Sequence, residues 1–575
     1  MLRSTVPLPP RRKLKDRLSA PPALGALAVG YVFWLASLRP TLLPRPAVMQ
    51  GALSALCLNV GYGVGGVLVG WGVWLGRRNG WSGPSAQLRR AARRALLVLG
   101  AVGVVAGVPM WLAWQNQQRE LVNLPTVGVG AVVTMLVVTV LAGLVLFFVF
   151  GRLFAAMWSR VDVGLSSLWN PVAARLMGGA MLVLFFAIVF NTVVVDGVLS
   201  RLEASYAEGD NTTAAGVEQP TSTHVTGGPG SLAPWDTLGL EGRTWVGGTS
   251  TVEQLQAFAG PGVTVTEPVR AYAGLQSEPD VDRRAQLAVA ELERAGGFDR
   301  KVLVVATATG SGFVNAVMSS ALEYQWAGDS AIVSMQYSYL PSWIAFLVGR
   351  DKAIEAGTAL NTAVLEKWST LPRATRPRLV VFGESLGSMG SEPTFRRSTA
   401  QASVDDATER ADSVLWVGPT NNNEVWSQVV GDRTPGSPVW KAEFGDGRQV
   451  SFATSLDEIP PQRDGVSRIQ YLQHASDPVG WWNWYIAWRP PEWVTDRPHG
   501  PDVPQRPVGW FPFVTWICTS ADLIQGFGAP AGHGHNYNDA WAQALAGVSA
   551  PPGWTDAQTE QLQRAMLQLH GLGGN

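Results

Sequence analysis

The strongest chemical signal in the sequence is GESLG at residues 383–387, which fits the pattern G-x-S-x-G. A serine in this pattern is an exposed nucleophile when a strand turns sharply into a helix at that residue and the glycines permit close approach. Residues 379–382 before it are apolar, as expected for a buried parallel strand. In a chain with 63 glycines the pattern alone is weak, but its place after such a strand favours covalent catalysis by Ser385.

A serine hydroxyl needs a base, usually histidine, which a carboxylate holds in one orientation. Asp477 follows an expected strand at residues 468–473 and is the predicted carboxylate, with capping of the next turn as the alternative. The loop GHGHNY at residues 532–537 is predicted to supply the base. His535 is slightly favoured because it is nearer the helix that follows, and His533 stays open.

The same chemistry needs donors that stabilise a developing oxyanion. The backbone N–H of Leu386 is the first predicted donor. The second is expected from Thr309, Gly310 and Ser311, in a glycine-rich loop after the apolar strand at 301–307. A phosphate-binding loop is the rival interpretation, but the lysine of that motif is missing.

The elements that must position these residues alternate between strands and helices. This alternation predicts an α/β domain with a mostly parallel sheet covered by helices on both faces. Its ligand site then lies beyond the carboxyl ends of the strands. The expected strands are 301–307, 331–336, 378–382, 413–417 and 468–473, and the expected helices are 282–295, 315–324, 351–370, 541–546 and 558–569.

The first 200 residues have a different composition. Charged residues make up 15% of the chain, below the roughly 25% usual for soluble proteins, and the deficit lies mostly before residue 200. A helix of about 20 apolar residues can cross a bilayer. The sequence predicts five such spans, of which the first contains two prolines: 18–38, 47–76, 95–118, 126–151 and 176–195.

Lysine and arginine are concentrated before the first span and in alternate loops after it. The positive-inside rule then places the N-terminus in the cytoplasm and everything after about residue 196 outside it. The spans carry no charged residue at their middle, which favours a membrane anchor over a transport pathway. We therefore expect a multi-pass protein of the cell membrane with an extracytoplasmic catalytic domain.

Three regions follow from these patterns: a transmembrane domain at 1–200, a linker or irregular segment at 201–248, and a catalytic domain at 249–575. Formal net charge is zero, so no basic field indicates a nucleic-acid partner. Cys57 and Cys518 are the only cysteines, and they predict neither a disulfide framework nor a metal site. No cofactor is expected.

Tryptophan is unusually frequent, with 25 residues, and several lie between Asp477 and the histidine loop. The segment 481–516 is typical of a lid, an acyl-chain groove or a surface at the membrane interface. Core packing is an equally good explanation. In the first case Trp481, Trp482 and Trp484 would face lipid.

Taken together, the motifs resemble the bacterial membrane-anchored alpha/beta-hydrolases called alpha/beta-hydrolase family 9, over essentially the whole chain. The most specific strings include ATATGSGFVN (306–315), FGESLGSMGSE (382–392), HASDPVGWW (474–482) and PAGHGHNY (530–537). Residues 394–397 (TFRR) depart from the smaller or apolar residues expected after the serine helix, which bears on pocket shape. The resemblance implies hydrolase chemistry at Ser385 and a membrane location.

The sequence thus predicts a serine esterase, lipase or acyltransferase that acts on a membrane lipid or another acyl ester of the cell envelope. Ser385 attacks the acyl carbonyl, His535 or His533 takes its proton, and Asp477 orients the histidine. A peptidase with the same residues is the runner-up. A non-catalytic membrane scaffold and a transporter are the alternatives from other classes.

Overall fold

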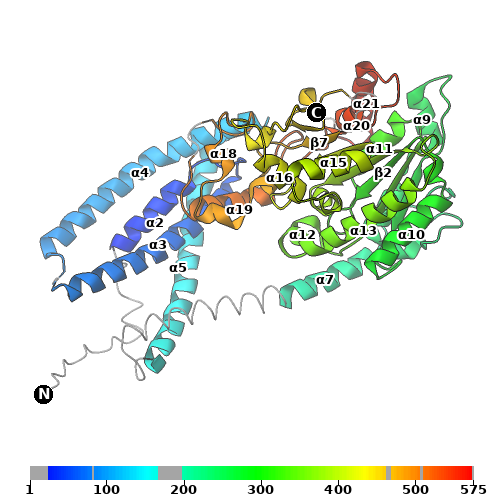
Figure 1. Ribbon diagram of the computed structural model, residues 1–575. Helices are drawn as coiled ribbons and strands as arrows, with labels where there is room; N and C mark the ends of the chain where they lie inside the picture. The colour runs from blue at the N-terminus through cyan, green and yellow to red at the C-terminus, as the bar shows by residue number, and fades with distance from the viewer. Residues whose placement is uncertain (1–23, 81–82, 166–196, 462–467, 506–508, 573–575) are drawn as a thin grey trace. The chain divides into compact units, whose positions relative to one another are not determined.

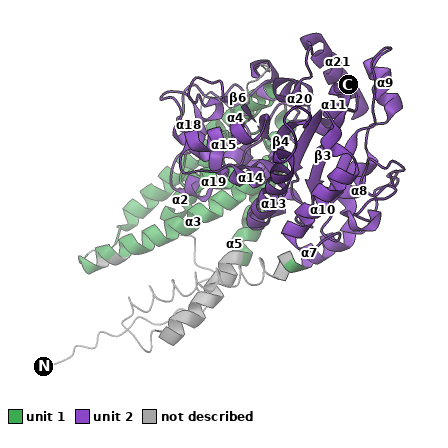
Figure 2. Cartoon of the chain, turned by 45° about the vertical axis from the view of Figure 1, so that its right-hand side comes forward, with its two compact units in different colours: residues 1–120, 124–200, 506–521 green, residues 121–123, 201–505, 522–575 purple. Residues whose placement is uncertain are grey.

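The computed structural model describes residues 24–80, 83–165, 197–461, 468–505 and 509–572 (Figure 1). The chain divides into two compact units, coloured separately in Figure 2. The first unit is drawn from residues 1–120, 124–200 and 506–521, and the second from residues 121–123, 201–505 and 522–575. Each unit is described below by itself.

The first unit consists mainly of apolar helices, α2 (Leu24–Ser37), α3 (Ala47–Arg78), α4 (Ala86–Leu121) and α5 (Val129–Leu165). Three of them contain stretches long and apolar enough to cross a membrane, Ala47–Val73, Ala86–Leu121 and Val129–Val149. They correspond to the second, third and fourth expected spans. At the first expected span, α2 is a shorter apolar helix of 14 residues. The fifth expected span, 176–195, lies outside the described residues.

Close packing of α2 against α3 depends on glycine. A Cβ on Gly61 would lie 2.6 Å from the Phe33 ring, and one on Gly65 would lie 2.8 Å from the Ala26 backbone. Any larger residue at these two positions would therefore push the helices apart. The neighbouring Gly63 has open space around its Cβ position within the described part of the chain.

The first half of α19 (Val514–Gly526) belongs to the same unit. Val514 and Ile517 form an apolar cluster with Phe33 of α2 and with the two cysteines. Cys57 and Cys518 are both buried, and they pack here as small side chains among apolar residues.

The second unit contains a seven-stranded sheet in the order β1-β3-β2-β4-β5-β7-β6, and all of its neighbouring strands are parallel. This confirms the α/β architecture expected from the alternating pattern. The strands are β1 (Val269–Ala273), β2 (Val302–Thr307), β3 (Ser330–Met335), β4 (Arg378–Glu384), β5 (Ser413–Val417), β6 (Val450–Ala453) and β7 (Ile469–Leu472). Since parallel strands end at one edge, Thr307, Glu384, Val417 and Leu472 bring their loops together there.

Helices cover both faces of this sheet (Figure 1). α11, α20 and α21 pack together on one face, while α10, α13 and α14 pack together on the other. The longer helices of the unit are α7 (Gly197–Asp210), α8 (Gly239–Gly247), α9 (Val252–Ala259), α10 (Val281–Arg294), α11 (Ala316–Gln325), α13 (Arg350–Ser369), α15 (Ala400–Arg410), α16 (Glu424–Gly431), α20 (Trp541–Ser549) and α21 (Asp556–Leu569). The shorter ones are α12 (Ser342–Val348), α14 (Leu386–Ser391), α17 (Pro478–Trp481) and α18 (Glu492–Thr495).

The central strands are apolar on both faces because both faces are covered. In β2, Val302, Val304 and Ala306 face the cluster made by α11, α20 and α21. The alternate residues Leu303 and Val305 are also fully buried, and a strand directs them to the opposite face. This two-sided burial explains why the strand reads as a continuous apolar run.

The segment 201–248 differs from the expected linker or irregular stretch. It contains most of α7 and all of α8, and it belongs to the second unit. Trp245 joins the sheet core, and the buried Arg243 donates hydrogen bonds to the carbonyls of Asp210 and Thr212. The sequence predicted a linker because small and polar residues dominate the segment. The few buried side chains that hold it against the second unit leave no periodic pattern.

Candidate active site

Ser385 lies at a sharp turn between β4 and α14. Its backbone has φ 54° and ψ −121°, a conformation that residues other than glycine rarely adopt. Its N–H donates to the carbonyl of Val417 at the end of the neighbouring strand (2.8 Å). This turn presents the Ser385 side chain at the carboxyl edge of the sheet, as the sequence pattern predicted.

Two glycines make the turn sterically possible. A Cβ on Gly383 would lie 2.5 Å from the backbone of Gly387, and a Cβ on Gly387 would lie 2.2 Å from the carbonyl oxygen of Thr307. Contacts this short are excluded for any side chain, so strand, turn and helix approach closely only when both positions are glycine.

The Asp477 carboxylate is fully buried and accepts three hydrogen bonds. Oδ1 accepts from the N–H of Val479, so this residue does cap the following turn. Oδ2 accepts from Nδ1 of His535 at 2.7 Å and from the hydroxyl of Tyr537 at 2.8 Å. Turn capping and orientation of a histidine, which the sequence offered as alternatives, are therefore performed by the same side chain.

His535 is buried, and its ring lies against a backbone that has no room for a side chain. A Cβ on Gly418, which has φ +55°, would be 2.8 Å from Cε1 of His535. Burial by itself would lower the pKa of His535, but the charge and hydrogen bond of Asp477, with the charge of Glu384, raise this pKa above its ordinary value. The environment thus stabilises an imidazolium ion.

His533, the alternative base, faces a different carboxylate. Its Nδ1 lies 3.6 Å from Oδ2 of Asp502. Its Nε2 lies 3.2 Å from the side-chain amide of Asn123, which belongs to the same compact unit. Asp502 in turn accepts a short hydrogen bond from the hydroxyl of Ser476. His535 therefore pairs with Asp477, whereas His533 lies nearer Asp502, and this difference distinguishes the two histidines of the loop.

The expected oxyanion loop follows β2, but two of its backbone donors are engaged within the fold. The N–H of Thr309 donates to the carbonyl of Phe313 (2.9 Å), and the N–H of Gly310 donates to the hydroxyl of Tyr337 (2.7 Å). Ser311 accepts a hydrogen bond at its carbonyl and does not line the pocket at Ser385. The hydroxyl of Thr309 is buried and has no hydrogen-bond partner among the described residues.

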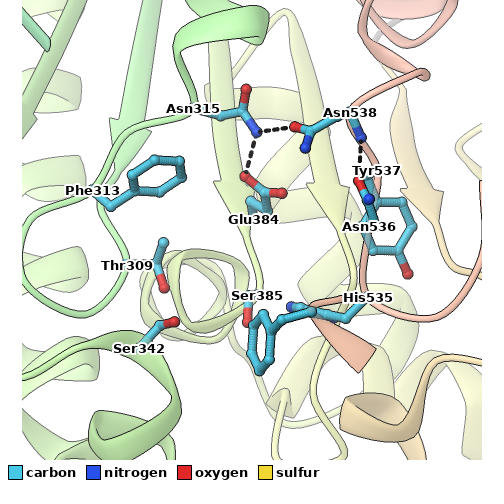
Figure 3. Close-up of a pocket in the computed structure, with 11 residues that line it drawn as sticks. Thr309, Phe313, Asn315, Ser342, Glu384, Ser385, His535, Asn536, Tyr537 and Asn538 are labelled. Atoms are coloured by element: carbon cyan, nitrogen blue, oxygen red, sulfur yellow. Dashed lines mark hydrogen bonds between the residues drawn. The ribbon is translucent and has the colours of Figure 1, made fainter. Parts of the chain in front are cut away.

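Ser385 and His535 line one pocket of about 180 Å³ (Figure 3). Thr309 and Ser342 lie on one side of Ser385 and His535 lies on the other. No hydrogen bond joins Ser385 to His535 within the described structure, and such catalytic hydrogen bonds often tighten only when substrate binds. The remaining lining residues are Phe313, Asn315, Glu384, Phe527, Asn536, Tyr537 and Asn538.

Several of these residues were not singled out in the sequence, although each lies inside a motif that was. Glu384 is the variable residue before the serine in G-x-S-x-G, Tyr537 ends the histidine loop, and Asn315 ends the string at 306–315. The sequence could have indicated them by their position, because each stands within four residues of a predicted site residue. Asn315 also caps α11 by accepting from the N–H of Val317 and of Met318.

The tryptophan-rich segment contains both buried and exposed tryptophans. Trp481 and Trp482 are buried, which corrects the lipid-facing expectation for these two side chains. The ring of Trp482 packs against that of Phe346, with the ring centroids 6.1 Å apart, and Nε1 of Trp481 donates to the carbonyl of Ala475. Trp484 and Trp488, by contrast, are 60% and 54% exposed.

A parallel sheet with a serine on a tight strand–helix turn, and with a histidine–aspartate pair after later strands, defines an α/β-hydrolase-type domain. The chain belongs to the alpha/beta-hydrolase family, whose sequence profile matches residues 269–562, just over half of the chain. A profile of the alpha/beta-hydrolase family N-terminus matches residues 38–249. These matches confirm the resemblance found in the motifs. Searches among curated proteins and solved structures give no match.

The pairing of His535 with Asp477 leads to a test that needs no substrate. Replacing Asp477→Asn removes the charge that raises the pKa of His535, so this pKa should fall in a histidine-selective NMR titration. Asp502→Asn is the matched control, because Asp502 faces His533. An equal fall of the His535 pKa in both variants would contradict the pairing.

Proposed function

We propose that the protein is a membrane-anchored serine hydrolase of the esterase, lipase or acyltransferase type. The observation that carries this proposal is the pocket that Ser385 and His535 share. Nδ1 of His535 donates a hydrogen bond to the carboxylate of Asp477, which fixes the orientation of the ring. Family membership supports hydrolase chemistry in general. The narrower assignment to acyl esters depends on the site.

In the proposed reaction the Ser385 hydroxyl attacks the acyl carbonyl while His535 accepts its proton through Nε2. The resulting imidazolium ion is stabilised by the carboxylate of Asp477. Collapse of the tetrahedral intermediate breaks the ester bond, and His535 returns the proton to the departing alcohol oxygen. Water or an acceptor alcohol then attacks the acyl-serine with the same proton transfers in reverse, which releases an acid or a new ester and restores the serine.

Two donors are proposed for the oxyanion. Leu386 begins α14 directly after the nucleophile, so its N–H projects from the amino end of a helix toward the developing charge. The second donor is the hydroxyl of Thr309, rather than a backbone N–H of its loop, because this hydroxyl is buried at the pocket without another partner among the described residues. An unpaired buried hydroxyl is costly unless a ligand uses it.

The surroundings of the pocket favour an amphiphilic ester. At about 180 Å³ the pocket is smaller than the 300–1,000 Å³ (roughly) of sites that enclose drug-sized ligands. Two of its lining residues, Phe313 and Phe527, are 41% and 43% exposed. Trp343 and Leu347 of α12, which begins at the lining residue Ser342, are also exposed. A longer acyl chain would therefore continue along apolar surface, as expected for an enzyme that acts on lipid.

The covalent chemistry is tested with a fluorophosphonate probe on the full chain in detergent. Wild type should be labelled, and Ser385→Ala should lose the label. His535→Ala should lower hydrolysis of 4-nitrophenyl butyrate on the order of 10³-fold or more, since it removes the base. His533→Ala is the matched control and should retain most of the activity. Absence of labelling in folded wild type would favour a non-catalytic scaffold. If His533→Ala is inactive while His535→Ala retains activity, His533 is the base instead.

The role of Thr309 is tested by an isosteric change. Thr309→Val keeps the shape of the side chain but removes the hydroxyl, so kcat should fall about 10²–10³-fold with little change in KM. Thr309→Ser keeps the hydroxyl and should recover most of kcat. If the serine variant is as impaired as the valine variant, the methyl group matters for packing and the hydroxyl is not the donor.

The charge pattern of the N-terminal region supports a catalytic domain outside the cytoplasm. A reporter that is active only outside the cytoplasm should therefore be active when fused after Asn575. The same reporter fused at Ser85, in a loop with many arginines, should be silent. The reverse pattern would place the catalytic domain in the cytoplasm and exclude substrates of the outer leaflet.

A further inference from the structure

Glu384 is a carboxyl group at the reacting centre that the proposed mechanism does not use. It precedes the nucleophile in the chain and lines the same pocket. Burial raises its pKa, against the opposing effects of the His535 charge and of a hydrogen bond from Asn315. A carboxyl group is costly to bury without partners, so a second use for this side chain is expected.

The hydrogen bonds of Glu384 leave part of the carboxyl group open to the pocket. Its Oε2 accepts from Nδ2 of Asn315 at 3.1 Å, and no other described residue donates to the carboxyl group. The same Asn315 nitrogen also donates to Oδ1 of Asn538 at 3.3 Å. No hydrogen bond from the amide nitrogen of Asn538 to another described residue is present, so this nitrogen is available as a donor. Glu384 and Asn538 together offer an acceptor and a donor on one wall of the pocket (Figure 3).

This polar wall belongs to the alcohol side of the reaction. His535 must reach the departing oxygen in order to protonate it, so the alcohol portion leaves on the His535 side of Ser385. Asn538 follows His535 by three residues in the same loop, and both residues line one pocket with Glu384. Thr309, the proposed oxyanion donor, lies on the other side of Ser385 (Figure 3).

We propose that Glu384 and Asn538 form a subsite for a hydroxyl group on the alcohol portion of the substrate, which is then an acyl ester of a polyhydroxy alcohol. A hydroxyl group can donate to the open oxygen of Glu384 and accept from the amide of Asn538 at the same time. An ammonium group could use only the carboxylate, and an alkyl group could use neither partner. This inference rests on the proposed function, because it assigns the alcohol that Ser385 displaces.

The test compares two esters that differ only in hydroxyl groups, 1-butyrylglycerol and propyl butyrate. The measured quantity is the ratio of their kcat/KM values, determined for the full chain in detergent. A change in the pKa of His535 affects both esters alike and cancels in this ratio. Wild type should prefer 1-butyrylglycerol, and Glu384→Gln should reduce the preference about 10-fold or more, as expected for loss of a hydrogen bond to a charged group.

Two further variants complete the design. Asn538→Ala should reduce the ratio by a smaller factor, because a neutral hydrogen bond is weaker than a charge-assisted one. Glu366→Gln removes an exposed carboxylate on α13 outside the pocket and should leave the ratio unchanged. Fluorophosphonate labelling of Glu384→Gln shows whether Ser385 is still correctly placed in that variant.

The possible outcomes separate the subsite from the proposed function. If wild type hydrolyses both esters without preference, or if Glu384→Gln keeps the wild-type ratio, the subsite proposal is wrong. The proposed hydrolase function is not affected by either result. If butyrylcholine is preferred over its uncharged analogue 3,3-dimethylbutyl butyrate while 1-butyrylglycerol is not preferred, the subsite binds cations and the hydroxyl assignment is overturned. If neither ester reacts and Ser385 takes no label, the proposed function itself fails.

Discussion

The strained turn at Ser385 is the constraint on which the rest of the catalytic unit depends. A residue other than glycine at φ 54° and ψ −121° costs on the order of 1–3 kcal/mol, so the surroundings must hold it. They do so from both sides of the turn. The carbonyl of Val417 fixes the N–H of Ser385, and the carbonyl of Ser385 accepts from the hydroxyl of Ser388 at 2.6 Å. The sheet and the helix thus fix the backbone of Ser385 together.

Beneath the turn, the buried carboxyl group of Glu392 ties neighbouring elements to α14. It accepts hydrogen bonds from Asn423, from Tyr471 and from the N–H groups of Val425 and Trp426. Burial raises the pKa of Glu392 to about 7 although these donors oppose the shift. The same Asn423 amide also reaches the hydroxyl of Ser388. A continuous polar network therefore runs from the sheet to Ser385, the proposed nucleophile, and low local polarity strengthens each of its bonds.

Patterns in the sequence predict the features that depend on periodicity and strand ends. They locate five of the seven strands, the turn at Ser385 and the placement of Asp477 after β7. They miss β1 because its Arg270 looks incompatible with a buried strand, whereas this side chain is buried in an ion pair with Glu323 at 2.6 Å. The choice between His533 and His535 was also beyond the sequence. Both share one loop, and only tertiary structure shows which carboxylate each faces.

The pocket and its rim support the amphiphilic substrate proposed above. The pocket that contains Ser385 is lined by the polar side chains of Glu384 and Asn538 and also by Phe313 and Phe527, which are partly exposed. A substrate with a polar alcohol and an apolar acyl chain can satisfy both parts, but a uniformly polar or uniformly apolar ester leaves one of them unmatched. Such amphiphilic molecules concentrate in bilayers. Because the chain also carries helices long and apolar enough to cross a membrane, a membrane anchor would raise the effective concentration of the proposed enzyme at such a substrate.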